Sequence, residues 1–151
     1  MNLISGEYYR YASGLFLHQD LLHIFANASV MYWLGRYLEP QIDPSKLLLF
    51  SLSLGTITNI LFSFLYPQAQ SVGGSPLVYA LLGLIVALQI MDADIFTFQF
   101  GTWYGNWIIS YVILSNMLHR SDNVGAAWVI HGTAVLLGIL FGCVCLKWKL
   151  F

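Results

Sequence analysis

The chain has 151 residues, of which 58% are hydrophobic and 9% are charged. A soluble domain has roughly 45–50% apolar and about 25% charged residues, so charges this sparse cannot cover a water-facing surface. The net charge of −1, with no basic run, excludes the electrostatic surface that nucleic-acid-binding proteins need. Composition therefore indicates that lipid is the main solvent of this protein.

The first twenty residues are mixed in character and rich in aromatic side chains. Tyr8, Tyr9, Tyr11 and Phe16 lie here among polar residues. Aromatic rings with polar tips settle at the boundary between lipid and water, so we predict an external interfacial segment over residues 1–20. A strand of a soluble domain is the alternative.

Five apolar stretches follow, separated by polar residues or proline. Each is close to the ~20 residues that cross a hydrocarbon core as a helix. An open sheet would leave backbone groups unpaired in lipid, so all five are predicted to be helical. The predicted spans are residues 21–38, 46–66, 75–91, 102–118 and 126–146. The expected fold is thus an all-α, polytopic transmembrane bundle in a single membrane domain, residues 1–151.

Lysine and arginine in the connecting segments predict the orientation of the bundle. Five spans place the two chain ends on opposite sides of the membrane. A cytoplasmic C-terminus puts four basic residues inside and two outside, and the positive-inside rule favours that orientation. The inside residues would be Arg36, Lys46, Lys147 and Lys149, and the outside residues Arg10 and Arg120.

Two cysteines, Cys143 and Cys145, lie in the last apolar stretch. On a helix they point to different faces, which argues against a mutual disulfide. No other Cys or His stands at the spacing of a metal site. Neither a metal nor an organic cofactor is expected.

Polar side chains at membrane depth cost free energy unless they face a bundle interior or a water-filled cavity. His23 and Asn27 are four residues apart and share one face of the first span. Ser75 opens the third span, and His131 lies inside the last. The simpler interpretation is a packing serine and a buried His–Asn pair that joins helices.

Ser75 stands in the segment Ser71-Val72-Gly73-Gly74-Ser75-Pro76. This is a glycine-rich turn that leads into a helix with Pro76 at its first position, so Ser75 is the expected N-cap. The amino end of a helix carries partial positive charge and N–H groups that suit a developing oxyanion. Either Ser75 only caps the helix, or the same geometry serves a reaction.

Two stripes of residues predict that the third and last spans pack closely. Tyr79 and Gly83 follow Ser75 along one face, and Gly138 follows His131 along another. Close packing would bring the imidazole of His131 to the hydroxyl of Ser75, as in a serine–histidine hydrolase. Side-chain N–H groups of the first span, from His23 and Asn27, would complete an oxyanion hole.

The chain resembles the rhomboid intramembrane serine proteases in three blocks that occur in the family's order. These are the segment from Glu7-Tyr8-Tyr9-Arg10 to His23-x-x-x-Asn27, the Gly73-Gly74-Ser75 motif with Tyr79, and His131 with Gly138. The resemblance implies that Ser75 is the nucleophile and His131 its general base. It also implies that His23, Asn27 and the backbone N–H of Ser75 form the oxyanion hole.

The resemblance assigns supporting roles as well. Tyr79 would pack beneath the His131 ring, Gly73 would belong to the serine-bearing turn, His18 would order a water-accessible cavity, and Arg10 would anchor the external loop. Three features differ from the family: Pro76 follows the serine, Ala134 replaces the first glycine of the last helix, and the family's first helix is expected to be missing.

The resemblance therefore implies a serine endopeptidase that cleaves transmembrane segments of other membrane proteins without a cofactor. A catalytically inactive rhomboid-like protein that binds client transmembrane helices is the alternative. A transporter is a third interpretation, but no Asp, Glu, Lys or Arg lies well inside a span. The oligomeric state stays open.

Overall fold

The computed structural model describes residues 6–68, 71–91, 101–117 and 124–151, and within these ranges every regular element is helical. The elements in chain order are α1 (Arg10–Ser13), η2 (Gly14–Phe16), α2 (Leu21–Leu38), α3 (Pro44–Leu65), α4 (Ser75–Met91), α5 (Trp103–Met117) and α6 (Val124–Lys147). The predicted all-α fold class is confirmed.

The five long helices lie on the five apolar stretches. α2 and α4 have the bounds expected of them. α3 begins earlier than expected because Asp43 caps it, accepting hydrogen bonds from the backbone N–H groups of Ser45 (2.9 Å) and Lys46 (3.3 Å). Pro44 then occupies the first turn, where its missing N–H costs nothing.

The segment before α2 contains a short helix that the sequence did not predict. Tyr11 of α1 is buried, and its carbonyl accepts a hydrogen bond from Nδ2 of Asn59 in α3 (2.9 Å). Leu15 of η2 is also buried and packs beside Gly55. The strand alternative is wrong for residues 6–20, and residues 1–5 lie outside the described ranges. α1 and η2 are therefore docked onto α3.

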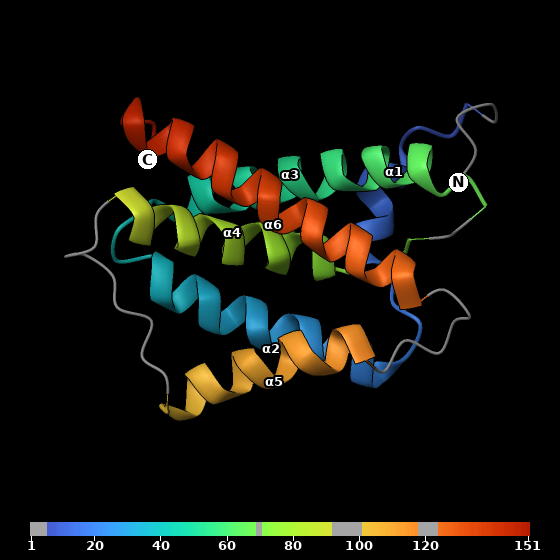
Figure 1. Ribbon diagram of the computed structural model, residues 1–151, viewed down its shortest axis with the longest axis horizontal. Helices are drawn as coiled ribbons and strands as arrows, with labels where there is room; N and C mark the ends of the chain where they lie inside the picture. Colours follow the sequence, from blue (N-terminus) through green and yellow to red (C-terminus); the bar gives the residue numbers. More distant parts are fainter. Residues whose placement is uncertain (1–5, 69–70, 92–100, 118–123) are drawn as a thin grey trace.

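α4 runs through the middle of the bundle (Figure 1). It packs most extensively on α6, and also on α3 and α2, so most of its side chains are buried. α5 lies at the edge beside α2, held by three aromatic pairs between the two helices: Phe25–Trp107, Trp33–Trp103 and Tyr37–Tyr104. The core is thus built around one central helix.

Glycines set the close approach of α4 and α6. A methyl group added to Gly83 would overlap the backbone carbonyl of Val135, and one added to Gly138 would overlap the carbonyl of Ala80. Backbone therefore packs directly on backbone here, as small residues allow between membrane helices.

Two helices among the described residues are long and apolar enough to cross a bilayer: Pro44–Leu65 and Gly125–Lys147. Ser75–Met91 is apolar but shorter. Large apolar side chains such as Leu49, Leu136 and Leu140 are more than half exposed on the outside of the bundle. Such a surface suits lipid better than water.

Candidate active site

Ser75 and His131 meet at the amino end of α4. The hydroxyl oxygen of Ser75 lies 3.1 Å from Nε2 of His131, although 56 residues separate them in the chain. His131 comes from α6 and is 3% exposed, whereas Ser75 is only partly buried. The structure thus places a hydroxyl and an imidazole nitrogen within hydrogen-bond distance at a partly accessible point.

Ser75 is the first residue of α4 rather than its cap. The carbonyl of Gly74 accepts the first helical hydrogen bond, from the N–H of Val78 (3.3 Å). The predicted capping role of Ser75 was therefore wrong by one residue, because the helix already begins inside the Gly–Ser turn. Ser75 keeps its own backbone N–H in the first turn, next to Pro76, which has none.

Tyr79 stacks on the imidazole of His131. The two rings are nearly parallel, at an interplanar angle of 11°, with centroids 4.1 Å apart. Tyr79 lies one helical turn below Ser75, so α4 supplies both the hydroxyl and the flat surface on which the ring rests. Gly138 lies further along α6, where it lets that helix approach α4.

The turn that carries Ser75 is held by groups from the segment before α2. The N–H of Gly73 donates to the carbonyl of Gly14 (3.0 Å), and the N–H of Gly74 donates to Nε2 of His18 (3.3 Å). Nδ1 of His18 lies 3.2 Å from the carbonyl of Phe16, an acceptor, so Nδ1 carries the hydrogen and Nε2 accepts. His18 thus contacts the serine turn directly.

Gly73 has a φ of +121°, which side chains rarely adopt, and it lies against the other two predicted residues. A Cβ on Gly73 would stand 2.7 Å from Cε1 of His23 and 3.6 Å from Nδ2 of Asn27. The structure therefore brings His23 and Asn27 beside the turn that bears Ser75.

The side-chain amide of Asn27 has a hydrogen-bond partner for its oxygen but not, among the described residues, for its nitrogen. Its Oδ1 accepts a hydrogen bond from the hydroxyl of Tyr111 in α5 (2.5 Å). Its Nδ2 is buried, yet within the described part of the chain it has no hydrogen-bond partner. A buried donor without a partner costs about 1–3 kcal/mol, and this one lies beside Gly73 in the turn that bears Ser75.

Sequence reasoning missed the contribution of α5. Asn116 is 1% exposed and its Oδ1 lies 2.9 Å from Nδ1 of His131. Tyr111 orients Asn27, and Ser115 lies 2.7 Å from the hydroxyl of Tyr79. A signal was present, since Asn116 falls inside a predicted span, where a polar side chain needs a reason to be.

Arg10 lies away from these groups, on the exposed surface. It pairs with Glu7 at 2.7 Å in the segment before α2. The Tyr9 hydroxyl and the Glu7 carboxylate raise the pKa of its guanidinium above the ordinary value. No group of three or more His, Cys, Asp or Glu side chains that could hold a metal occurs among the described residues.

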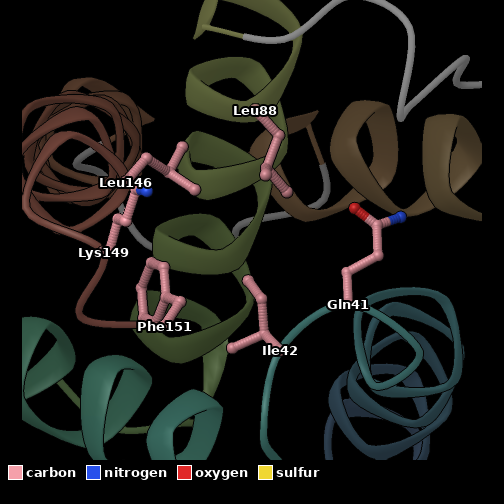
Figure 2. A pocket seen from close by; sticks show the side chains of 6 residues that line it. All are labelled: Gln41, Ile42, Leu88, Leu146, Lys149 and Phe151. Carbon is pink, nitrogen blue, oxygen red and sulfur yellow. The ribbon is translucent and has the colours of Figure 1, made fainter.

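A hollow of about 450 Å³ opens at the other end of the bundle (Figure 2). Leu88, on its wall, is 13 residues beyond Ser75 in α4, or about 20 Å along the helix. The hollow is lined by four apolar and two polar residues: Ile42, Leu88, Leu146 and Phe151, with Gln41 and Lys149. The Ser75–His131 pair is therefore a separate feature.

Comparison with known proteins matches almost the whole chain to one family, described as Rhomboid domain, over residues 5–148. The rhomboid protease GluP of Bacillus subtilis (strain 168) is 25% identical over 100 residues, which cover 66% of this chain and 20% of that protein. The rhomboid protease GlpG of Yersinia pestis (strain Pestoides F) is 36% identical over 83 residues, 52% of this chain and 28% of that protein. GlpG of Yersinia pseudotuberculosis serotype I (strain IP32953) matches equally. The chain thus spans less than a third of the length of these curated relatives.

Proposed function

The chain belongs to the rhomboid family, whose members are integral membrane proteins, and we propose that it is a serine endopeptidase that cleaves transmembrane segments of other membrane proteins. The observation that carries the proposal is the 3.1 Å approach of the Ser75 hydroxyl to Nε2 of His131. That distance is within the range at which a base can take a proton from a nucleophile.

The proposed reaction has two halves. Ser75 attacks the scissile carbonyl carbon while its proton passes to Nε2 of His131, and that proton then goes to the leaving nitrogen as the C–N bond breaks. The product is an ester on Ser75. A water molecule gives a proton to Nε2, attacks the ester carbon, and collapse of the intermediate returns the proton to Ser75.

Donors for the developing oxyanion lie beside the nucleophile. Asn27 offers a buried Nδ2 without a partner among the described residues, and His23 lies against the same turn. The backbone N–H of Ser75 is a third donor, since Pro76 has none. Donors held in place before the reaction are worth more in a water-poor site than in water.

Substrates of this proposed enzyme are membrane proteins whose helix unwinds near one face of the bilayer. Ser75 stands at the end of α4 rather than in its middle, so water has a short path to it. The orientation predicted from basic residues puts this end outside and the C-terminus in the cytoplasm.

Labelling of the full chain with a fluorophosphonate tests the proposal. The reagent should modify the intact protein in detergent or in proteoliposomes, and Ser75→Ala should abolish labelling. Ser53→Ala removes an exposed serine of α3 and serves as the matched control. No labelling of a folded chain would overturn the protease and leave a catalytically inactive rhomboid-like protein that binds client helices.

A further inference from the structure

Asn116 of α5 occupies the side of the His131 ring that faces away from Ser75. Its Oδ1 lies 2.9 Å from Nδ1 of His131, whose Nε2 lies 3.1 Å from the Ser75 hydroxyl. We propose that Asn116 is a positioning residue, which holds His131 in the one tautomer that can act as a base. This inference rests on the proposed function, because it assigns a third member to the same site.

The orientation of the Asn116 amide follows from its other contacts. One end of the amide lies 2.8 Å from the carbonyl of Val112 and 2.7 Å from the hydroxyl of Tyr79. A backbone carbonyl only accepts hydrogen bonds, so the end that faces Val112 must be the NH₂ group. The remaining end is the oxygen, and it faces Nδ1 of His131.

The tautomer of His131 follows from that orientation. Because an amide oxygen also only accepts, Nδ1 must carry the hydrogen. In a neutral imidazole the other nitrogen, Nε2, then has a lone pair, and it points at Ser75. The opposite tautomer would put two acceptors together at Asn116 and offer Ser75 a donor where a base is required.

The rest of the network leaves the amide little freedom. Tyr79 accepts from Nδ2 of Asn116 through its hydroxyl, which can donate to Ser115 at 2.7 Å. The ring of Tyr79 also stacks on the imidazole of His131. Tyr79 therefore restricts the His131 ring by stacking and the Asn116 amide by hydrogen bonding. With Asn116 1% exposed, water does not compete for these bonds.

An amide suits this place better than a carboxylate. It accepts the Nδ1 hydrogen without putting a full charge inside an apolar bundle, which is costly in lipid. It still stabilises the imidazolium that forms when Ser75 gives up its proton, because the amide oxygen carries partial negative charge. Asn116 thus supplies the orientation that a buried acid supplies in soluble serine hydrolases.

Kinetics on the full chain in proteoliposomes test the role. Asn116→Leu keeps the volume but removes the acceptor, and kcat should fall about 10- to 100-fold with KM little changed. Asn116→Asp restores an oxygen facing Nδ1 but loses the donor to the Val112 carbonyl, so it should recover only part of that loss. Asn106→Leu, on the exposed side of the same helix, is the matched control. Equal activity of Asn116→Leu and the parent, or equal loss in the Leu and Asp variants, would overturn the proposal.

Nitrogen NMR of the histidine rings tests the tautomer without any turnover. In the Ser75→Ala chain, His131 should show a protonated Nδ1 and an unprotonated Nε2, and adding Asn116→Leu should mix the two tautomers. A ring protonated on Nε2 in the parent would refute the inference. Because this readout does not depend on catalysis, it separates failure of the Asn116 role from failure of the proposed protease.

Discussion

The hydroxyl of Tyr111 donates a hydrogen bond to Oδ1 of Asn27 over 2.5 Å, so α5 determines which way an amide on α2 points. With the oxygen engaged, the NH₂ end of Asn27 faces Gly73 and the turn that bears Ser75. One bond between an edge helix and its neighbour therefore orients a donor at the proposed reaction centre.

Removal of the Asn27 amide should slow the proposed reaction strongly. Loss of one oxyanion donor costs about 100- to 1,000-fold in turnover, and we expect Asn27→Ala to fall in that range. Folding should persist with a loss of about 1–3 kcal/mol, because the buried hydroxyl of Tyr111 loses its acceptor whereas Nδ2 has no partner to lose within the described residues. Cleavage rates of a reconstituted substrate measure the effect. A loss under threefold in a folded protein would remove Asn27 from the oxyanion hole.

Tyr111→Phe should have a smaller effect of the same kind. The amide of Asn27 loses the bond that orients it but stays in place, so we expect a rate about 3- to 10-fold lower, equivalent to roughly one neutral hydrogen bond. Tyr104→Phe changes another tyrosine of α5 that packs on α2 and should leave the rate unchanged. Equal effects of the two variants would mean that only the packing of α5 matters.

Gly73→Ala should abolish activity by two separable effects. A φ of +121° strains any side chain, at about 1–3 kcal/mol, and the new methyl would also push on the ring of His23. Gly101→Ala shares the positive φ but meets no atom within 4 Å, so it isolates the strain. Thermal unfolding should show the larger destabilisation in Gly73→Ala, and only Gly73→Ala should stop fluorophosphonate labelling. Normal labelling of Gly73→Ala would contradict the tight turn.

Gly83→Ala should weaken the packing of α4 on α6. The added methyl overlaps the backbone of Val135, which cannot move as a side chain does, so we expect a loss of about 1–3 kcal/mol in stability. Gly132→Ala, where nothing lies within 4 Å of a new methyl, should be neutral or stabilise by up to ~1 kcal/mol. Unfolding of both variants in mixed detergent micelles measures the difference. If Gly83→Ala were as stable as the parent, α4 and α6 would have to lie farther apart than they do in the structure.

The positions of the long helices were predictable because each is an apolar stretch bounded by polar residues or proline. α4 begins at Ser75 and ends at Met91, as the Gly–Ser–Pro segment and the acids after it indicate. The pairing of α4 with α6 was predictable too, since their glycine stripes match. α1 was missed because four residues give no periodicity, and its fold depends on contacts with Asn59 far along the chain.

The candidate site was predictable where a short motif carries the residue, and not elsewhere. Ser75, His131 and Asn27 stand in recognisable local patterns, and the structure brings them to one end of the bundle. Asn116 stands in no such pattern. Its place next to His131 depends on how α5 rotates against α6, which hydropathy does not encode.

The glycine contact between α4 and α6 fixes one point of their crossing, and the Ser75–His131 pair of the proposed enzyme lies beyond it. Ser75 lies eight residues from Gly83, about 12 Å along the helix, and His131 lies at a similar distance from Gly138. A change of about 5° in the crossing of the two helices would therefore move Ser75 by roughly 1 Å relative to His131. A misplacement of that size can cost about 100-fold in rate. Helices tilt when bilayer thickness changes, so in the proposed enzyme the rate would depend on the thickness of the surrounding bilayer.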